Sequence, residues 1–262
     1  MACKIRRGRH KGGMIHPTAY HISSSGHRIA YQQRAGEGAV GVTFIHGFRS
    51  DMASTKATAM SEWCAARNIP FTVFDCFAHG QSDGDFLEFT IGRALESTLE
   101  ILDHVASGDQ ILVGSSMGGW ISLLAARERK GQVRGLVGIA AAPDFTEDIW
   151  LRHMTPEHRA TVENEGVIWV PSDYGSDYPI TQQFIRDGRH HLLLDDVIGL
   201  DIPMHFIQGQ QDADVPWETA LKIAKAVTSD EVAVHLIKDG EHRLSRPQDL
   251  AAIFSAVEKL LA

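Results

Sequence analysis

The chain has 262 residues, of which 44% are hydrophobic and 22% are charged, and its formal net charge is −8. This length fits one α/β domain, and the composition is that of a soluble globular protein, not of a disordered or collagen-like one. The acidic balance offers no basic surface for phosphates, so nucleic acid is excluded as an expected partner.

The N-terminus is basic, since the first 27 residues hold five lysines and arginines and no acidic residue. This pattern has some likeness to a mitochondrial targeting segment, but glycines at 8, 12 and 13 and Pro17 interrupt any helix there. We therefore expect a mobile basic tail over about 1–18, ahead of a single domain that fills the rest of the chain.

Two further features concern membranes and disulfides. The longest apolar stretch, around 136–142, is far shorter than the roughly 20 residues that span a bilayer, so we expect no membrane span. Cys3, Cys64 and Cys76 form no C-x-x-C pair, and an odd number without a secretory signal favours free thiols in a reducing compartment.

Short apolar or β-branched runs alternate with segments of helical periodicity along the chain. The expected strands cover 27–32, 42–45, 71–74, 110–113, 136–140, 204–207 and 232–237. The expected helices cover 56–67, 90–105, 117–129, 217–227 and 248–261. This alternation predicts an α/β fold with a mostly parallel central sheet and helices on both faces, which binds ligands at the carboxyl ends of its strands.

One interval breaks the alternation, because about 58 residues separate the strand ending near Ala141 from the strand beginning near Ile202. No strong strand is expected in between, while 155–163 and 181–187 have the pattern of short helices. We expect a small helical lid, inserted into the single domain over about 145–200.

The strand over 110–113 runs directly into the sequence G-x-S-x-G at 114–118, and a helix follows. A serine on such a strand-turn-helix is the nucleophile elbow, in which Ser116 lies on a strained turn. Glycines at 114 and 118 relieve the crowding that this turn creates. Ser115 is the alternative nucleophile, but a shift by one residue would break the glycine spacing.

A serine hydroxyl is a weak nucleophile, so it needs a general base and an acid that orients the base. Asp212 follows the strand over 204–207, and His242 follows the last strand, in the order Ser, Asp, His that this fold uses. Asp214 is the rival acid, with capping of the helix after Pro216 as its alternative role. His242 alone among the 14 histidines holds this topological position.

The segment His46-Gly47-Phe48 follows the strand over 42–45, where a loop must offer a backbone N–H to a developing oxyanion. We expect Phe48 and Met117 to supply these N–H groups and the His46 ring to be a packed, hydrogen-bonded loop residue. The stretch 75–82 is expected to be structural, and Cys76 to be a buried small hydrophobe.

No metal or cofactor is expected. The sequence has no H-E-x-x-H motif, no Cys/His pair at zinc spacing and no acidic loop of the EF-hand type. It also has neither a G-x-G-x-x-G fingerprint nor a phosphate-binding P-loop.

Five segments carry a resemblance to a known family, the α/β-hydrolases. They are FIHGFRSDM at 44–52, DCFAHGQSDG at 75–84, QILVGSSMGGW at 110–120, DADVPW at 212–217 and His242-Arg243. Within that superfamily the chain resembles the mitochondrial palmitoyl-protein thioesterases and their bacterial relatives, over nearly its whole length after the basic tail. The resemblance implies Ser116, Asp212 and His242 as a catalytic triad and Phe48 with Met117 as the oxyanion hole.

The same resemblance implies hydrolysis of an acyl thioester or ester, on a small molecule or on an acylated protein, through an acyl-enzyme and without a cofactor. A carboxylesterase or a carbon–carbon bond hydrolase with the same triad is the alternative enzyme, and a ligand-binding protein without activity is the alternative of another class. The expected location is the cytoplasm for a bacterial protein and the mitochondrion for a eukaryotic one. The oligomeric state is not predicted.

Overall fold

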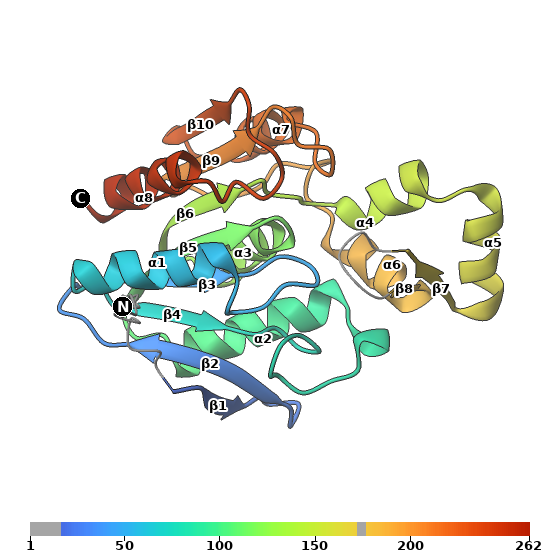
Figure 1. Cartoon of the computed structure of the whole chain (residues 1–262), viewed down its shortest axis with the longest axis horizontal. Coiled ribbons are helices and arrows are strands. Elements are labelled where there is room, and N and C mark those ends of the chain that lie inside the picture. The colour runs from blue at the N-terminus through green and yellow to red at the C-terminus, as the bar shows by residue number, and fades with distance from the viewer. Residues whose placement is uncertain (1–16, 172–176) are drawn as a thin grey trace, which may run out of the picture.

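The computed structural model describes residues 17–171 and 177–262, so the basic tail expected over about 1–18 lies almost wholly outside the described residues. Eight strands form one sheet in the order β1-β2-β4-β3-β5-β6-β9-β10 (Figure 1). Strands β3, β4, β5, β6, β9 and β10 run parallel, whereas β2 is antiparallel to β4 and β1 is antiparallel to β2. The strands are β1 (Ala19–Ile22), β2 (Arg28–Arg34), β3 (Val40–Ile45), β4 (Phe71–Phe74), β5 (Asp109–Ser115), β6 (Val133–Ile139), β9 (Met204–Gly209) and β10 (Val232–Ile237).

The seven expected strands are all present, and the mostly parallel sheet is confirmed. The central strands β3 and β5 are almost fully buried, because helices cover both of their faces. Strand β1 is an addition to the expected set. It has only four residues at the sheet edge, with one face exposed, so its sequence carries too little periodic signal to stand out.

Helices pack on both faces of the sheet and divide the core into two layers (Figure 1). Helices α2 (Ile91–His104), α3 (Met117–Glu128) and α7 (Glu218–Ala226) cover one face, where Trp120 is fully buried. Helices α1 (Thr55–Ala66) and α8 (Pro247–Leu261) cover the other, where the rings of Trp63 and Phe254 stack 5.5 Å apart. All five correspond to expected helices.

The segment over 145–200, which we call the insertion, projects from one end of the sheet (Figure 1). Its helices α5 and α6 match the two short helices that the sequence predicts. Its elements are α4 (Phe145–Asp148), a π-helical turn (Ile149–His153), α5 (Pro156–Glu165), β7 (Val167–Val170), β8 (Tyr178–Thr181), α6 (Gln182–Gly188) and a 3-10 turn (Arg189–His191).

The antiparallel pair β7 and β8 corrects the expectation of a purely helical insertion. Each strand has only four residues, and Pro179 in β8 argues against a strand in a larger sheet. In a two-stranded sheet, however, every strand is an edge strand, and there a proline can be accommodated.

The parallel strands bring four loops to one end of the sheet. Strand β3 leads into Phe48, β5 into Ser116, β9 toward Asp212 and β10 toward His242. No helix among the described residues is both long and apolar enough to cross a membrane.

The central strand β5 allows a direct test of the two-layer core. Leu112 is fully buried, so Leu112→Ala should lower the free energy of unfolding by about 2 to 5 kcal/mol through lost burial and a residual cavity. Leu221 on α7 is 44% exposed, and Leu221→Ala should change it by less than about 0.5 kcal/mol. Urea unfolding of both variants measures the difference, and equal losses would contradict the described core.

Candidate active site

Ser116 occupies the turn between β5 and α3 with a strained backbone. Its φ is 54° and its ψ is −117°, a region that non-glycine residues enter only at a cost of about 1 to 3 kcal/mol. Its N–H donates to the Ile139 carbonyl at 2.8 Å, and its own carbonyl accepts from Gly119 at 2.9 Å and Ala142 at 3.1 Å. These three hydrogen bonds hold the turn against the loops beside it.

Glycines make the turn sterically possible. A Cβ atom at Gly114 would collide with the carbonyl of Gly118, and one at Gly118 would collide with the carbonyl of Ile45. The close approach of β3, β5 and α3 therefore requires glycine at both positions, as the sequence predicts. Ser115 is buried in this contact, whereas Ser116 is partly exposed.

The structure brings Ser116, His242 and Asp212 into one hydrogen-bonded row, although 126 residues separate the first two. The Ser116 Oγ and the His242 Nε2 are 3.2 Å apart, and the His242 Nδ1 and the Asp212 Oδ2 are 2.9 Å apart. A carboxylate only accepts, so Nδ1 carries the proton and Nε2 is free to accept the Ser116 hydroxyl proton. The His242 side chain is 25% exposed, while that of Asp212 is fully buried.

Every oxygen of the Asp212 carboxylate is hydrogen-bonded. The Oδ2 atom accepts from His242 and from the Gln208 Nε2 at 2.8 Å, and Oδ1 accepts the backbone N–H groups of Asp214 and Val215, both at 2.9 Å. Burial alone would raise the pKa of Asp212, but these donors and the nearby imidazole outweigh it, so the pKa is lowered. The acid stays ionised beside His242.

Gln208 is a member of this site that the sequence does not single out. It is buried in β9, four residues before Asp212, and its amide also donates to the Val215 carbonyl at 3.3 Å. A glutamine within a buried strand belongs to no sequence motif. The only signal in the sequence is an amide side chain in an apolar strand, four residues before the predicted acid.

Asp214 occupies a different place from Asp212. Its side chain is exposed, and its backbone N–H is among the groups that hold the Asp212 carboxylate. Helix α7 begins with Trp217 as its N-cap, without a side-chain capping bond. The alternative role for Asp214, capping of this helix, is therefore not the arrangement observed.

The loop after β3 passes directly over Ser116. A Cβ atom at Gly47 would lie 3.2 Å from the Ser115 carbonyl oxygen and 3.4 Å from the Ser116 Cβ. The backbone at Gly47 thus lies beside the serine side chain, and Met117, which follows Ser116 in the chain, is the first residue of helix α3.

Two buried histidines fix this loop. The His46 Nε2 accepts the Cys76 N–H at 3.0 Å, and the His79 Nε2 accepts the Arg49 N–H at 3.1 Å. Their Nδ1 atoms donate to the carbonyls of Gly47 at 2.8 Å and Phe77 at 2.9 Å. Both rings are therefore neutral, and His46 is the packed loop residue that the sequence predicts.

Asp75 completes the same network, which joins the loop over 46–52 to the stretch over 75–82. Its carboxylate accepts the N–H groups of Met52 at 2.7 Å and Gln81 at 2.8 Å. Burial raises the pKa of Asp75, lowers that of His46 and lowers that of His79 to about 3. Burial also raises the pKa of the Cys76 thiol, which agrees with a packing role for Cys76.

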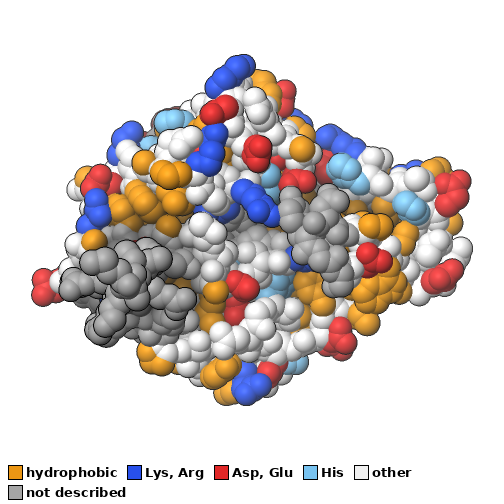
Figure 2. All heavy atoms as spheres, viewed as in Figure 1, with side chains coloured by type: hydrophobic (Ala, Val, Ile, Leu, Met, Phe, Trp, Pro, Cys, Tyr) orange, Lys and Arg blue, Asp and Glu red, His pale blue; other side chains and the backbone are white. Residues whose placement is uncertain are grey.

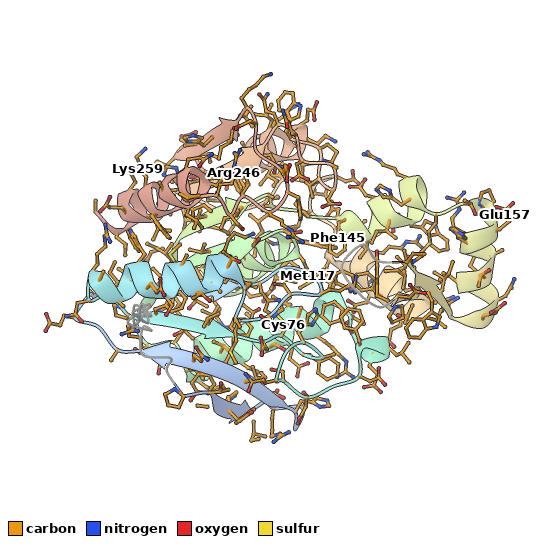
Figure 3. All side chains as sticks on the ribbon, in the orientation of Figure 1. Cys76, Met117, Phe145, Glu157, Arg246 and Lys259 are labelled. Carbon is orange, nitrogen blue, oxygen red and sulfur yellow. The ribbon has the colours of Figure 1, made fainter. Side chains whose placement is uncertain are left out.

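The Phe48 ring belongs to an aromatic cluster between the sheet and the insertion. It stacks on Phe184 of α6 at 5.3 Å and 13°, and it lies 5.7 Å from Phe145 of α4 and 6.0 Å from Tyr178 of β8. On the sheet side it lies 5.3 Å from Phe86. Figure 3 labels Phe145 and Met117 near this junction of the insertion with the sheet.

Asp212, Asp214 and His242 also offer ligand atoms within 4.8 Å of one another, a distance at which they could hold a cation. In the structure, however, His242 already bonds to Asp212 through one ring nitrogen and to Ser116 through the other. Their hydrogen-bonding pattern suits acyl transfer by a hydroxyl nucleophile better than metal binding.

A family model described as "Alpha/beta hydrolase family" matches residues 44–253. The chain belongs to the α/β-hydrolase family. It is 36% identical over 236 residues to "Palmitoyl-protein thioesterase ABHD10, mitochondrial" of Mus musculus. This alignment covers 89% of this chain and 78% of the mouse protein. The Homo sapiens protein of the same name is 36% identical over 235 residues, covering 89% and 76%.

Solved structures agree with this assignment. A putative hydrolase from Agrobacterium vitis S4 has a TM-score of 0.88 and 36% identity, and covers 94% of this α/β-hydrolase and all of the other chain. The mouse alpha/beta hydrolase domain-containing protein 10 has a TM-score of 0.86 and 34% identity, covering 94% and 98%. Est1E from Butyrivibrio proteoclasticus, at 19% identity and a TM-score of 0.76, shows the same fold.

The neutral state of His79 predicts sensitivity to acid. An imidazole in an unfolded chain has a pKa of about 6.5, against about 3 here, so between these values the unfolded state binds a proton that the folded state lacks. The free energy of unfolding should therefore fall as the pH falls below 6.5, by about 2 kcal/mol at pH 5 from this residue. Asp75 acts in the opposite sense, because burial raises its pKa.

His79→Gln isolates this contribution, because its amide can still accept the Arg49 N–H while it does not titrate. Urea unfolding at pH 7 and pH 5 should show a smaller loss of stability in this variant than in the wild type. His158→Gln, at an exposed position on α5, is the control and should keep the wild-type loss. An unchanged loss in His79→Gln would show that His79 is not buried in its neutral form.

Proposed function

We propose that this α/β-hydrolase cleaves acyl thioesters through a covalent acyl-enzyme on Ser116. The observation that carries the proposal is the row of hydrogen bonds from Ser116 through His242 to Asp212 on a strained, partly exposed turn. Such a row supplies the nucleophile, the base and the orienting acid of acyl transfer. The curated relatives at 36% identity, which are named palmitoyl-protein thioesterases, favour the thioester as the bond that is cleaved.

In the first step Ser116 Oγ attacks the acyl carbonyl while the His242 Nε2 takes its proton. The negative oxygen of the tetrahedral intermediate would accept the N–H groups of Phe48 and Met117. This assignment is supported by the position of Gly47, which lies against Ser116 and directly precedes Phe48, and by the start of helix α3 at Met117. The imidazolium then protonates the leaving thiol, and the acyl group stays on Ser116 as an ester.

In the second step His242 takes a proton from water as the water oxygen attacks the acyl-serine carbonyl. The imidazolium then returns this proton to Ser116 Oγ as the acyl–oxygen bond breaks and the carboxylic acid leaves. Asp212 keeps the Nδ1–H tautomer through both steps and stabilises the imidazolium that forms. Its lowered pKa means that it remains a carboxylate throughout. This reaction balances with water alone and uses no cofactor.

An apolar acyl group suits the surroundings of Ser116. Phe48 directly follows Gly47, which lies against Ser116, and its ring contacts three aromatic residues of the insertion, Phe145, Tyr178 and Phe184. Leu151 and Trp169 of the insertion are 65% and 56% exposed. Figure 2 shows hydrophobic side chains gathered over the insertion, which could bind a fatty acyl chain or an acylated protein.

A fluorophosphonate probe tests the nucleophile. The wild type and Ser115→Ala should be labelled, whereas Ser116→Ala should not, because only Ser116 bonds to His242.

Matched palmitoyl, octanoyl and acetyl substrates, each as a thioester and as an oxygen ester, then test the substrate class by kcat/KM. We expect the long-chain thioester to turn over fastest. Faster turnover of oxygen esters would instead indicate a carboxylesterase. Absence of labelling in the wild type would indicate a ligand-binding protein without activity.

The two aspartates offer a matched test of the orienting acid. Asp212→Asn should lower kcat by roughly 10⁴-fold, because the amide favours the wrong imidazole tautomer. Asp214→Asn should keep kcat within about threefold, because the Asp214 side chain is exposed and only its backbone holds Asp212. Steady-state kinetics of both folded variants decide the matter, and a larger loss in Asp214→Asn would reverse the assignment.

A further inference from the structure

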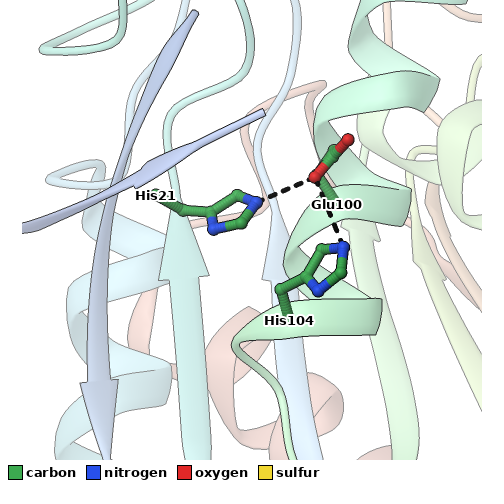
Figure 4. A group of neighbouring side chains, drawn as sticks. All are labelled: His21, Glu100 and His104. Carbon is green, nitrogen blue, oxygen red and sulfur yellow. Dashed lines mark hydrogen bonds and ion pairs between the residues drawn. The ribbon is translucent and has the colours of Figure 1, made fainter. Parts of the chain in front are cut away.

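A second cluster of ionisable side chains lies between β1 and α2 (Figure 4). The His21 Nε2 on β1 is 2.8 Å from the Glu100 Oε2 on α2. The Nε2 of His104, one helical turn after Glu100, is directed at the same oxygen from 3.7 Å. The three ligand atoms lie within 4.8 Å of one another, and the two imidazole rings stack with their centroids 5.1 Å apart.

We propose that His21, Glu100 and His104 bind a divalent transition-metal cation of the Zn²⁺ type. Two imidazole nitrogens and one carboxylate oxygen, with water in the fourth position, form a ligand set that Zn²⁺ uses. A tetrahedral site with bonds of about 2.1 Å needs ligand atoms about 3.4 Å apart. The observed separations of 2.8 and 3.7 Å lie on either side of this value, so small side-chain rotations suffice.

The carboxylate is oriented for this role. The Glu100 Oε1 accepts the Ser24 N–H at 2.8 Å, which fixes the group and leaves Oε2 facing the two imidazoles. Hydrogen bonds of this kind to a ligating carboxylate are typical of metal sites. The Glu100 side chain is 11% exposed, whereas His104 is 57% exposed. The anchor is thus buried, and the outer ligand leaves a path for the ion and for a water ligand.

A simple ion pair explains less of this arrangement. The pair of His21 with Glu100 needs one imidazole, yet a second one points its Nε2 at the same oxygen. The spacing of four residues places Glu100 and His104 on one face of α2, as chelation by a helix requires. Hard cations such as Ca²⁺ and Mg²⁺ prefer oxygen ligands throughout, so the two imidazoles select against them.

A metal ion at this place would join the short edge strand β1 to α2. Within residues 17–171 and 177–262, strand β1 pairs with β2 alone, and 79 residues separate His21 from Glu100. An ion that binds the folded chain in preference to the unfolded one stabilises it. None of the three ligands belongs to the row of Ser116, His242 and Asp212, so the site should affect stability and not the reaction.

The test is titration of the full chain with Zn²⁺, after treatment with a chelator, in a His242→Gln background. This background removes a ligand from the other possible cation site, formed by Asp212, Asp214 and His242. Isothermal titration calorimetry measures the affinity, and thermal unfolding measures the rise in Tm. The Zn²⁺ affinity and the rise in Tm are compared between variants, because Cys3 and the two histidines before residue 17 carry Zn²⁺-ligating groups and are present in every variant.

In that background, adding His21→Gln or His104→Gln should weaken Zn²⁺ binding at least about tenfold and abolish the rise in Tm. His158→Gln should leave both unchanged. His104→Cys should retain binding, because a thiolate also ligates Zn²⁺, and this distinguishes a lost ligand from a disturbed fold. Zn²⁺ affinity that is unchanged in His21→Gln and His104→Gln, or no Zn²⁺-dependent rise in Tm in the background protein, would overturn the proposal.

Discussion

The strained backbone at Ser116 is the constraint on which the rest of the site depends. The turn needs β3, β5 and α3 to approach so closely that side chains at Gly114 and Gly118 would collide with the neighbouring backbone. A cost of about 1 to 3 kcal/mol at one residue persists only where the surroundings determine it. Here the hydrogen bonds of Ser116 to β6 and to the loop after β6 hold the strained conformation in place. The buried parallel pairing of β5 with β3 and β6 keeps these hydrogen-bonding groups in register.

A buried polar network extends this order from the serine to the loop over it. Asp75, His46 and His79 each accept a backbone N–H from a segment distant in sequence, and together they fix the loop that carries Phe48. Burying such groups is costly unless their hydrogen bonds are made, so the network strongly favours one loop conformation. An oxyanion donor must be in place before charge develops, and a loop held only by apolar contacts would not position an N–H as well.

The parts of the structure that the sequence predicts share one property, which is that their signal is local. The elbow appears as five consecutive residues after an apolar strand, and the positions of Asp212 and His242 follow from the order of strands. Gln208, by contrast, matters because β9 turns its amide toward Asp212, and the neighbour of His21 is Glu100, 79 residues away. Pairings of this kind arise only when the sheet assembles. The pair β7 and β8 is hard to predict for another reason, since four residues with a proline are too few to form a recognisable pattern.

Phe48 links the two halves of the proposed mechanism. It directly follows Gly47, whose backbone lies beside Ser116, while its ring stacks on Phe184 and contacts Phe145, both of which belong to the insertion. A movement of the insertion would therefore remove apolar contacts from the same residue that carries a proposed oxyanion donor. An apolar acyl chain can replace such contacts, because the hydrophobic effect is non-directional and depends on the apolar area that is buried. A short or polar acyl group cannot, so the packing around Phe48 is a physical argument for the proposed preference for long acyl chains.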